Sequence, residues 1–206
     1  QYDPAAGKVT VRDILLDGKP PAKPNVPNWI LAPDGRTAYL IQLSDPTLIQ
    51  IHLLSDGETV AAKSHGKMLE GKNFDSRGAL AIGPDGMVYA LVRVDNTTGF
   101  GTGLLHHLVR FDPKSNTMQD LGVLAVKNPD FFDWSAGKPF THGYHRLPDG
   151  TLTPLHCHMA MIVARDGTIY ATILYPFTLL KLDALKGPGP RGSAKRFPFF
   201  RQNSDG

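Results

Sequence analysis

An internal repeat constrains the fold of this chain more than any other feature. Residues 30–40, 80–90 and 162–171 follow one pattern, an apolar stretch, an Asp-Gly pair and a second apolar stretch. An Asp-Gly pair supplies the positive-φ residue that a tight hairpin turn requires, and the alternation around it places one face of each strand inward. The repeat therefore predicts three β-hairpins of one design.

Further strands are expected after each hairpin. They are residues 48–54 and 58–63, 105–112 and 117–123, and 177–183. The first two copies are about 50 residues apart, from Tyr39 to Tyr89, and four antiparallel strands at such a period are typical of β-propeller blades. The predicted fold class is all-β, a β-propeller of four-stranded antiparallel blades. Residues 196–199 are an alternative outer strand for the third blade, although Pro198 would restrict them to a sheet edge.

The blades in the sequence are too few to close a propeller. Residues 2–4 and 8–15 match residues 111–113 and the strand after them, so the chain opens at the end of a unit and contains about three and a half blades. Propellers close with about four to eight blades. We therefore expect residues 1–206 to be a single propeller domain or part of one. An open propeller exposes two sheet edges, so we expect a partner chain or a missing segment to complete it.

Composition excludes several classes of protein. The 21 glycines and 17 prolines leave little room for long helices. The formal net charge of +3 is too small for a nucleic-acid footprint, so we expect no nucleic-acid partner. The longest apolar stretches are far below the roughly 20 residues of a membrane span. A single cysteine, Cys157, rules out an internal disulfide framework.

The third copy of the repeat comes late in the chain. Tyr89 and Tyr170 are about 80 residues apart rather than about 50, and we place the extra residues in an insertion at 124–157. Long loops inside compact domains are usually functional or disordered, and the aromatic content of this one argues against disorder. Trp134 and its aromatic neighbours are expected to pin the insertion onto the blades, with stacking on a sugar as the alternative.

Four histidines gather in and just after this insertion. They are His142, His145, His156 and His158. In a strand, alternation places His156 and His158 on one face and Cys157 on the other, so two imidazoles can converge. Imidazole suits zinc, manganese, copper or nickel, and Asp130 or Asp133 would complete the ligands. The prediction is a divalent metal site, with zinc or manganese preferred, and the alternative is that the histidines only bond loop carbonyls.

Propeller topology places the insertion relative to the blades. Loops that enter an innermost strand open on the same face as loops that join second and third strands, so the insertion is expected over the central channel. The loops 42–46 and 93–103 reach the same rim and contribute Arg93 and Asp95, while the Asp-Gly turns lie on the opposite face. His106 and His107 begin a strand, and we expect one ring to be buried and the other solvated.

The blade sequences resemble a known superfamily. The stretches APDGRTAYL, GPDGMVYAL and YDPAAGKVT look like blades of the YVTN, NHL and lactonase-like propellers. The resemblance reaches most of the chain, and such motifs specify architecture and not activity. A lactonase-like or streptogramin-lyase-like activity would rest on this blade resemblance alone.

The His-rich insertion resembles, in style, the active faces of propeller polysaccharide lyases. In those enzymes histidines hold a divalent metal, and His, Tyr and Arg neighbours act on a uronic acid. The resemblance implies catalytic roles for Tyr144, His145 and Arg146, and substrate binding by Arg93, Asp95 and Trp134. The metal or Arg146 would neutralise the uronate carboxylate, and Tyr144 or a histidine would act as the base.

The function predicted from these features is that of a metal-dependent lyase for uronate-containing polysaccharides. The alternative is a non-catalytic propeller that binds a carbohydrate, another small molecule or a protein partner. We also expect a secreted or periplasmic location. No Gly-x-Ser-x-Gly elbow, phosphate-binding loop or Cys-x-x-Cys pair indicates another class of chemistry.

Overall fold

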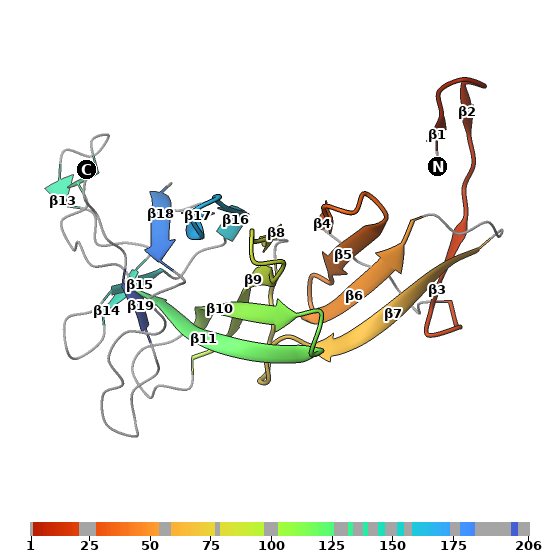
Figure 1. Ribbon diagram of the computed structural model, residues 1–206. Helices are drawn as coiled ribbons and strands as arrows, with labels where there is room; N and C mark the ends of the chain where they lie inside the picture. The colour runs from red at the N-terminus through yellow and green to blue at the C-terminus, as the bar shows by residue number, and fades with distance from the viewer. Residues whose placement is uncertain are drawn as a thin grey trace.

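The structure is a computed structural model in which every assigned element is a strand. It describes residues 2–20, 28–53, 59–76, 79–96, 103–125, 132–133, 138–139, 144–146, 152–154, 158–173, 178–183 and 199–201. The strands in these segments form six sheets, arranged along a curved row that does not close into a ring (Figure 1). No helix that could span a membrane is found among the described residues.

Three of the sheets are blades that follow one another along the chain. Blade one contains β4 (Asn28–Leu31), β5 (Thr37–Ile41), β6 (Thr47–His52) and β7 (Thr59–Lys67); blade two contains β8 (Leu80–Ile82), β9 (Val88–Asp95), β10 (Leu104–Asp112) and β11 (Thr117–Ala125); blade three contains β16 (His158–Val163), β17 (Thr168–Ile173) and β18 (Thr178–Asp183). Consecutive strands within each blade pair in antiparallel fashion. The first strands are innermost, because β8 contacts both β4 and β16. The predicted all-β fold of an incomplete propeller is confirmed.

Two sheet edges carry strands that differ from the sequence predictions. The strand expected at 8–15 is interrupted: β2 (Lys8–Val9) pairs with β1 (Tyr2–Asp3), whereas β3 (Asp13–Leu16) runs parallel to β7. The strand expected at 196–199 shares only Phe199 with β19 (Phe199–Arg201), which pairs with β11 of blade two and not with blade three. In both cases a free outer edge offers hydrogen-bonding groups to a distant segment, which local sequence cannot reveal.

The Asp-Gly turns are built alike in the three blades. Gly35, Gly86 and Gly167 have φ values of 66°, 78° and 83°. In each turn the glycine N–H bonds to the carbonyl three residues earlier, at 2.9–3.0 Å. The aspartate beside it accepts a backbone N–H at 2.8–3.1 Å, from Arg36, Met87 or Thr168. The predicted hairpins of one design are confirmed.

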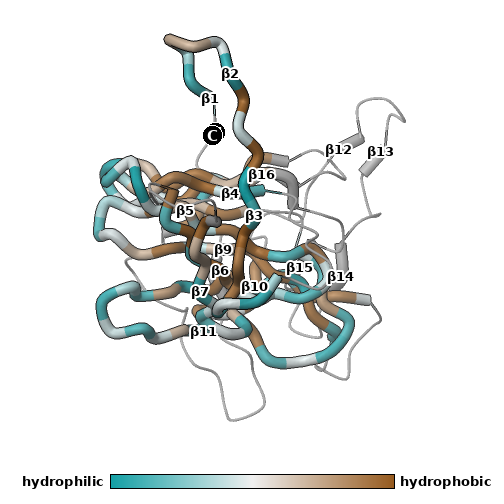
Figure 2. The backbone as a smooth tube through the Cα atoms, turned by 90° about the vertical axis from the view of Figure 1, so that its right-hand side faces the viewer, coloured by the Kyte–Doolittle hydropathy of each residue, from teal (hydrophilic) through white to brown (hydrophobic). Residues whose placement is uncertain are grey.

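The core lies between the blades. Tyr89 and Leu91 on one face of blade two pack with Met161 and Ile169 of blade three, and Val88 and its neighbours on the other face pack against blade one. Alternation along β9 therefore serves two interfaces, since both faces of a middle blade are covered. Figure 2 shows the apolar residues concentrated in the strands and the hydrophilic ones in the connections.

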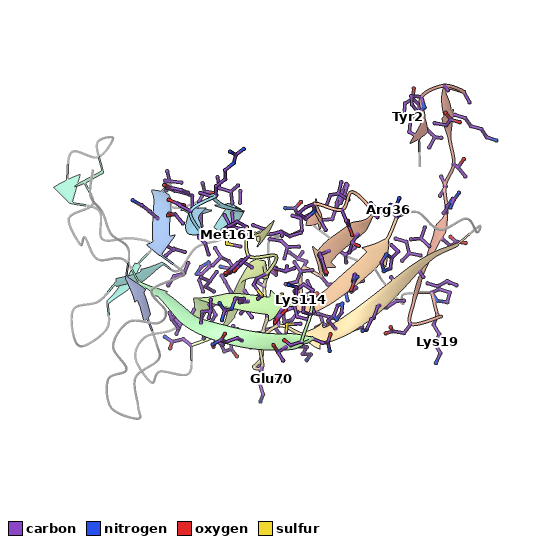
Figure 3. All side chains as sticks on the ribbon, viewed as in Figure 1. Tyr2, Lys19, Arg36, Glu70, Lys114 and Met161 are labelled. Atoms are coloured by element: carbon purple, nitrogen blue, oxygen red, sulfur yellow. The ribbon has the colours of Figure 1, made fainter. Side chains whose placement is uncertain are left out.

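The hairpin β1–β2 repeats the outer hairpin of blade two. Tyr2 pairs with Val9 as Phe111 pairs with Met118, and the turns hold their left-handed residues, Gly7 and Asn116, at matching places. Phe111 is fully buried, however, whereas 62% of Tyr2 is exposed. Figure 3 shows Tyr2 apart from the other labelled side chains.

Candidate functional site

The strand directions sort the connections into two ends of the blades. The Asp-Gly turns join first to second strands at one end, which we call the turn end. Antiparallel strands reverse direction at each turn, so the end of β9, the starts of β10 and β16, and the connection 68–79 lie at the other end. We call this the insertion end, because the insertion 124–157 leaves β11 and enters β16 there.

The structure describes four short strands of the insertion. β12 (Phe132–Asp133) pairs with β13 (Lys138–Pro139), and β14 (Tyr144–Arg146) pairs with β15 (Leu152–Pro154). β15 in turn contacts β10 and β11. The hairpin that carries the predicted catalytic residues therefore packs against blade two.

The predicted site residues are described unevenly. His142, His156, Trp134 and Asp130 lie outside the described residues. Tyr144, His145, Arg146, Asp133 and His158 are described by strand and register only: the first three form β14, Asp133 ends β12, and His158 begins β16. In the part of the chain that the structure describes, no group of three His, Cys, Asp or Glu side chains could hold a metal ion. The zinc or manganese site stays a prediction.

Arg93 is fully described and differs from its predicted place in a loop. It lies inside β9 and is only 9% exposed. Its Nη2 donates to Oδ2 of Asp75, and both backbones bond as well, Arg93 N–H to the Asp75 carbonyl at 2.9 Å and Asp75 N–H to the Arg93 carbonyl at 3.1 Å. The connection 68–79 thus adds a bridge to the inner edge of β9. The Arg93 charge is offset by a carboxylate of the chain itself.

Asp95 and Ser76 tie this connection to its surroundings. Oδ2 of Asp95 accepts a bond of 2.8 Å from Nδ2 of Asn73, and the Ser76 N–H donates to the Leu43 carbonyl at 2.8 Å. Ser76 is fully buried, and its Oγ has no hydrogen-bond partner among the described residues. The loops of blades one and two are therefore joined by polar contacts at the insertion end.

Both histidines at the start of β10 are buried, so the prediction of one solvated ring was wrong. His106 lies opposite Arg93 in the β9–β10 register, so the two side chains lie on the same face of blade two. His106 is fully buried. His107 faces the other way, is 5% exposed and has its Nδ1 2.9 Å from Oδ2 of Asp120. Neighbouring blades cover both faces of this sheet, and alternation alone does not show that.

Sequence reasoning missed Asp75, Ser76 and His106 as members of this polar cluster. A signal was present in the repeat. When the copies are aligned on their tyrosines, Arg93 falls where the other two copies have Leu43 and Leu174. A buried charge where sister blades have leucine is a departure that the fold does not need.

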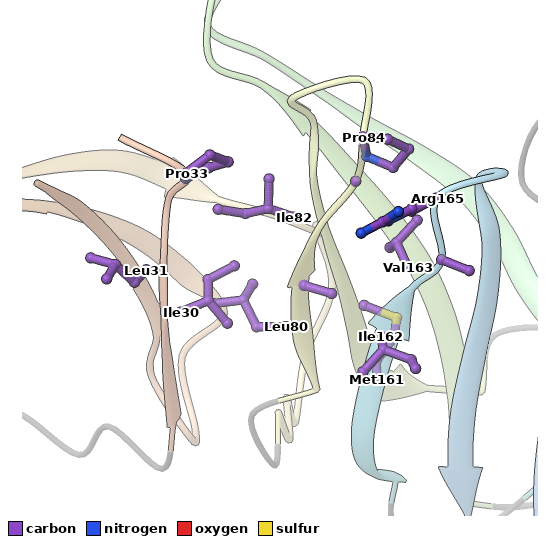
Figure 4. A pocket seen from close by; sticks show the side chains of 13 residues that line it. Ile30, Leu31, Pro33, Leu80, Ile82, Pro84, Met161, Ile162, Val163 and Arg165 are labelled. Carbon is purple, nitrogen blue, oxygen red and sulfur yellow. The ribbon is translucent and has the colours of Figure 1, made fainter. Parts of the chain in front are cut away.

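The turn end, in contrast, carries an apolar groove. It has a volume of about 560 Å³ and is lined by the innermost strands of all three blades, including Ile30, Leu80, Ile82, Met161 and Val163 (Figure 4). Arg165 is the cationic side chain in its lining. Four of the five buried polar residues in the described part of the chain lie instead at the insertion end.

Comparison with known proteins yields a distant structural similarity. No family model matches this sequence, and no curated protein matches it. Among solved structures, the chain is similar to a protein from Bacteroides uniformis described as a candidate 6-phosphogluconolactonase, with 16% identity and a TM-score of 0.33. The match covers 77% of this chain and 36% of that one, so this chain spans well under half of the length of the protein it matches.

Proposed function

We propose that this chain is part of a carbohydrate-active propeller whose insertion end carries a metal-dependent lyase centre for uronate-containing polysaccharides. The supporting observation is the packing of β15 against β10 and β11, at the end where β9 finishes and β16 begins. The hairpin that bears Tyr144 thereby packs against blade two, and β9, which bears Arg93, contacts β16, which begins at His158. Neither fold class nor similarity decides the activity, so the proposal rests on this convergence.

The proposed roles follow from elimination chemistry. His142, His145, His156 and His158 would hold a zinc or manganese ion, which would supply positive charge to neutralise the uronate carboxylate and acidify the adjacent C–H. Tyr144, or His145 where it is not a metal ligand, would take that proton as the C–O bond to the 4-linked sugar breaks and a C=C bond forms, and a second proton donor would protonate the departing sugar oxygen. Arg146 faces the carboxylate, and Arg93, Asp95 and Trp134 position the sugar.

A non-catalytic propeller that binds a carbohydrate or a protein is the second candidate. One observation favours it: Asp75 offsets the Arg93 charge. A lyase that must attract an anionic sugar would then depend on Arg146 and the metal ion alone. Turnover separates the two candidates.

We further propose that a partner chain or a further segment completes the propeller, in a secreted or periplasmic protein. The hairpin β1–β2 supports the first part, because it has the register of an outer blade hairpin but exposes Tyr2 and Val9. In blade two the corresponding hairpin, β10–β11, is extended by β9, which pairs with β10. A stable, monodisperse monomer of this chain would contradict the proposed completion.

The decisive experiment measures metal content and elimination together. The purified chain, the His156→Ala/His158→Ala double variant and a His52→Ala control are loaded with zinc or manganese, checked by circular dichroism and analysed for bound metal. His52 is an exposed residue at the turn end of β6, so its loss should change nothing. Each protein is then incubated with acidic polysaccharides while the absorbance of unsaturated uronate is followed.

Near-stoichiometric metal and a chelator-sensitive rise in absorbance, both lost in the folded double variant alone, would support the lyase. Retained polysaccharide without turnover would favour the binding module. Equal metal content in all three proteins would remove the His156 and His158 site.

A further inference from the structure

The Arg93–Asp75 pair is the least expected feature of the blades. Both side chains are largely buried, with 10% and 17% exposed, and they meet where β9 ends. Leu43 and Leu174 stand at the position of Arg93 in the sister copies, so an apolar residue satisfies this place in the repeat. Replacing a buried ion pair by apolar residues is often neutral or stabilising. Stability therefore does not explain why this blade carries the pair.

The pair sits among other buried polar groups. Ser76, Arg93, His106 and His107 account for four of the five buried polar residues in the described part of the chain, and the fifth, Thr37, belongs to an Asp-Gly turn. His106 lies beside Arg93 across the β9–β10 register, and Ser76 follows Asp75 directly. This concentration is confined to the insertion end of blade two.

Blade three brings its own predicted site to nearly the same level. Asp75 bridges Arg93, four residues after Tyr89, and His158 pairs with Ile173, three residues after Tyr170. Tyr89 and Tyr170 are equivalent positions of the repeat. Measured along the strands from these tyrosines, Asp75 and His158 therefore differ by one residue in their distance from the turn end, and both lie on the innermost chains of adjacent blades. The two innermost strands contact each other. A ligand at His158 would therefore lie near the pair.

The chemistry of the pair favours hydroxyl groups over an anion. The guanidinium presents donors only, the carboxylate presents acceptors only, and together they carry no net charge. A second carboxylate would be repelled by Asp75 as it approached Arg93. A sugar hydroxyl both donates and accepts, so two neighbouring hydroxyls can bond to the guanidinium and the carboxylate at once.

We propose that Arg93 and Asp75 form a sugar-hydroxyl subsite, which binds a vicinal diol of the carbohydrate beside the His158 site while other groups take its carboxylate. The inference rests on the proposed function for its ligand class, but it needs neither metal nor turnover. It changes the role of Arg93 from an anion contact to one half of a neutral pair. Asp75 becomes a binding residue in its own right.

The test measures binding in the presence of a chelator, so that it is independent of elimination. The probes are trimers of galacturonate and of mannuronate, together with their methyl esters, which keep the ring hydroxyls but lose the negative charge. The variants are Arg93→Leu/Asp75→Leu and, should that variant not fold, Arg93→Gln/Asp75→Asn. Arg36→Leu is the control, because Arg36 is an exposed arginine at an Asp-Gly turn.

We expect the double variants to lose affinity for a trimer and for its methyl ester by the same factor, about tenfold or more, while the control binds normally. A folded double variant that binds as tightly as the parent would overturn the proposal and leave the pair a structural contact. A loss confined to the acidic trimer would also overturn it, since the pair would then bind the carboxylate. No binding of any trimer by the parent would refute the ligand class.

These outcomes are separable from those of the lyase experiment. Chelator-resistant binding that the pair controls, without any elimination, would support the subsite and contradict the lyase. Elimination that persists unchanged in the Arg93→Leu/Asp75→Leu variant would support the lyase and contradict the subsite.

Discussion

The two ends of blade two are built on opposite principles. At the turn end, Asp85 accepts bonds from residues two and four positions away, and equivalent turns occur in blades one and three. At the insertion end, Asp75 and Arg93 are 18 residues apart and neither sister copy has an arginine at that place. Local, repeated polar contacts define the fold, whereas the distant, unrepeated contact is where this chain departs from its own repeat. Function is better sought in the departure.

The largest expected effect comes from breaking the buried pair. Arg93→Ala leaves the Asp75 carboxylate buried without its cation, and we expect the free energy of unfolding to fall by about 3 kcal/mol. Urea denaturation followed by circular dichroism measures this. Arg36→Ala is the matched change at the turn end and should cost under about 0.5 kcal/mol. Equal effects at the two ends would show that burial of the pair is not what distinguishes them.

How far the sequence predicts each end follows from the same contrast. The Asp-Gly pairs determine the turns within a few residues, so the positive-φ glycines and the antiparallel hairpins are predictable. The burial of His107 and the bond from Arg93 to Asp75 depend on segments that pack only after the blades assemble. The sequence predicts Arg93 in a loop because no local signal extends β9 that far.

Edges are unpredictable for a related reason. β3 pairs in parallel with β7 of blade one, and β19 pairs in parallel with β11 of blade two. Neither segment contains a sequence signal that identifies its partner strand. The candidate site divides in the same way: the sequence singles out the His-rich insertion and Arg93, but Asp75 becomes visible only through the bridge to β9.

The next effect in size tests whether the turns are equivalent. A Cβ at Gly35 or Gly86 would meet nothing within 4 Å, so Gly35→Ala and Gly86→Ala pay only for the left-handed backbone. We expect each to lower the free energy of unfolding by about 1–2 kcal/mol, measured by urea denaturation. If one substitution lowers the free energy of unfolding and the other leaves it unchanged, blade context, and not the local turn, sets the geometry.

Tyr89 distinguishes blade two at the turn end. Its hydroxyl donates to Oδ2 of Asp85 at 2.7 Å, and burial together with that carboxylate raises its pKa to about 12. Tyr89→Phe should cost about 1 kcal/mol at neutral pH, measured by urea denaturation. A folded-state pKa above the ordinary value of 10 contributes stability that is present below pH 10 and lost as the pH rises through 12. The free energy of unfolding of the variant should therefore fall less steeply between pH 10 and pH 12 than that of the parent. An unchanged fall would exclude Tyr89 as its source.

The smallest effect concerns the exposed turn aspartates. Backbone N–H groups of Arg36 and Thr37 hold the pKa of Asp34 below its ordinary value, and the Thr168 N–H does the same for the pKa of Asp166. A depressed folded-state pKa contributes stability that is present above the unfolded pKa of 3.8 and lost as the pH falls through the folded value. Thermal unfolding between pH 6 and pH 2.5 should therefore show a weaker acid-induced fall in Tm for Asp34→Asn and Asp166→Asn than for the parent. Because the same turn recurs, the acid-induced fall in Tm should be weakened equally in the two variants. If it is weakened in only one of them, the turns share a backbone geometry but differ in electrostatics. The turn end of the blades would then be less uniform than its sequence.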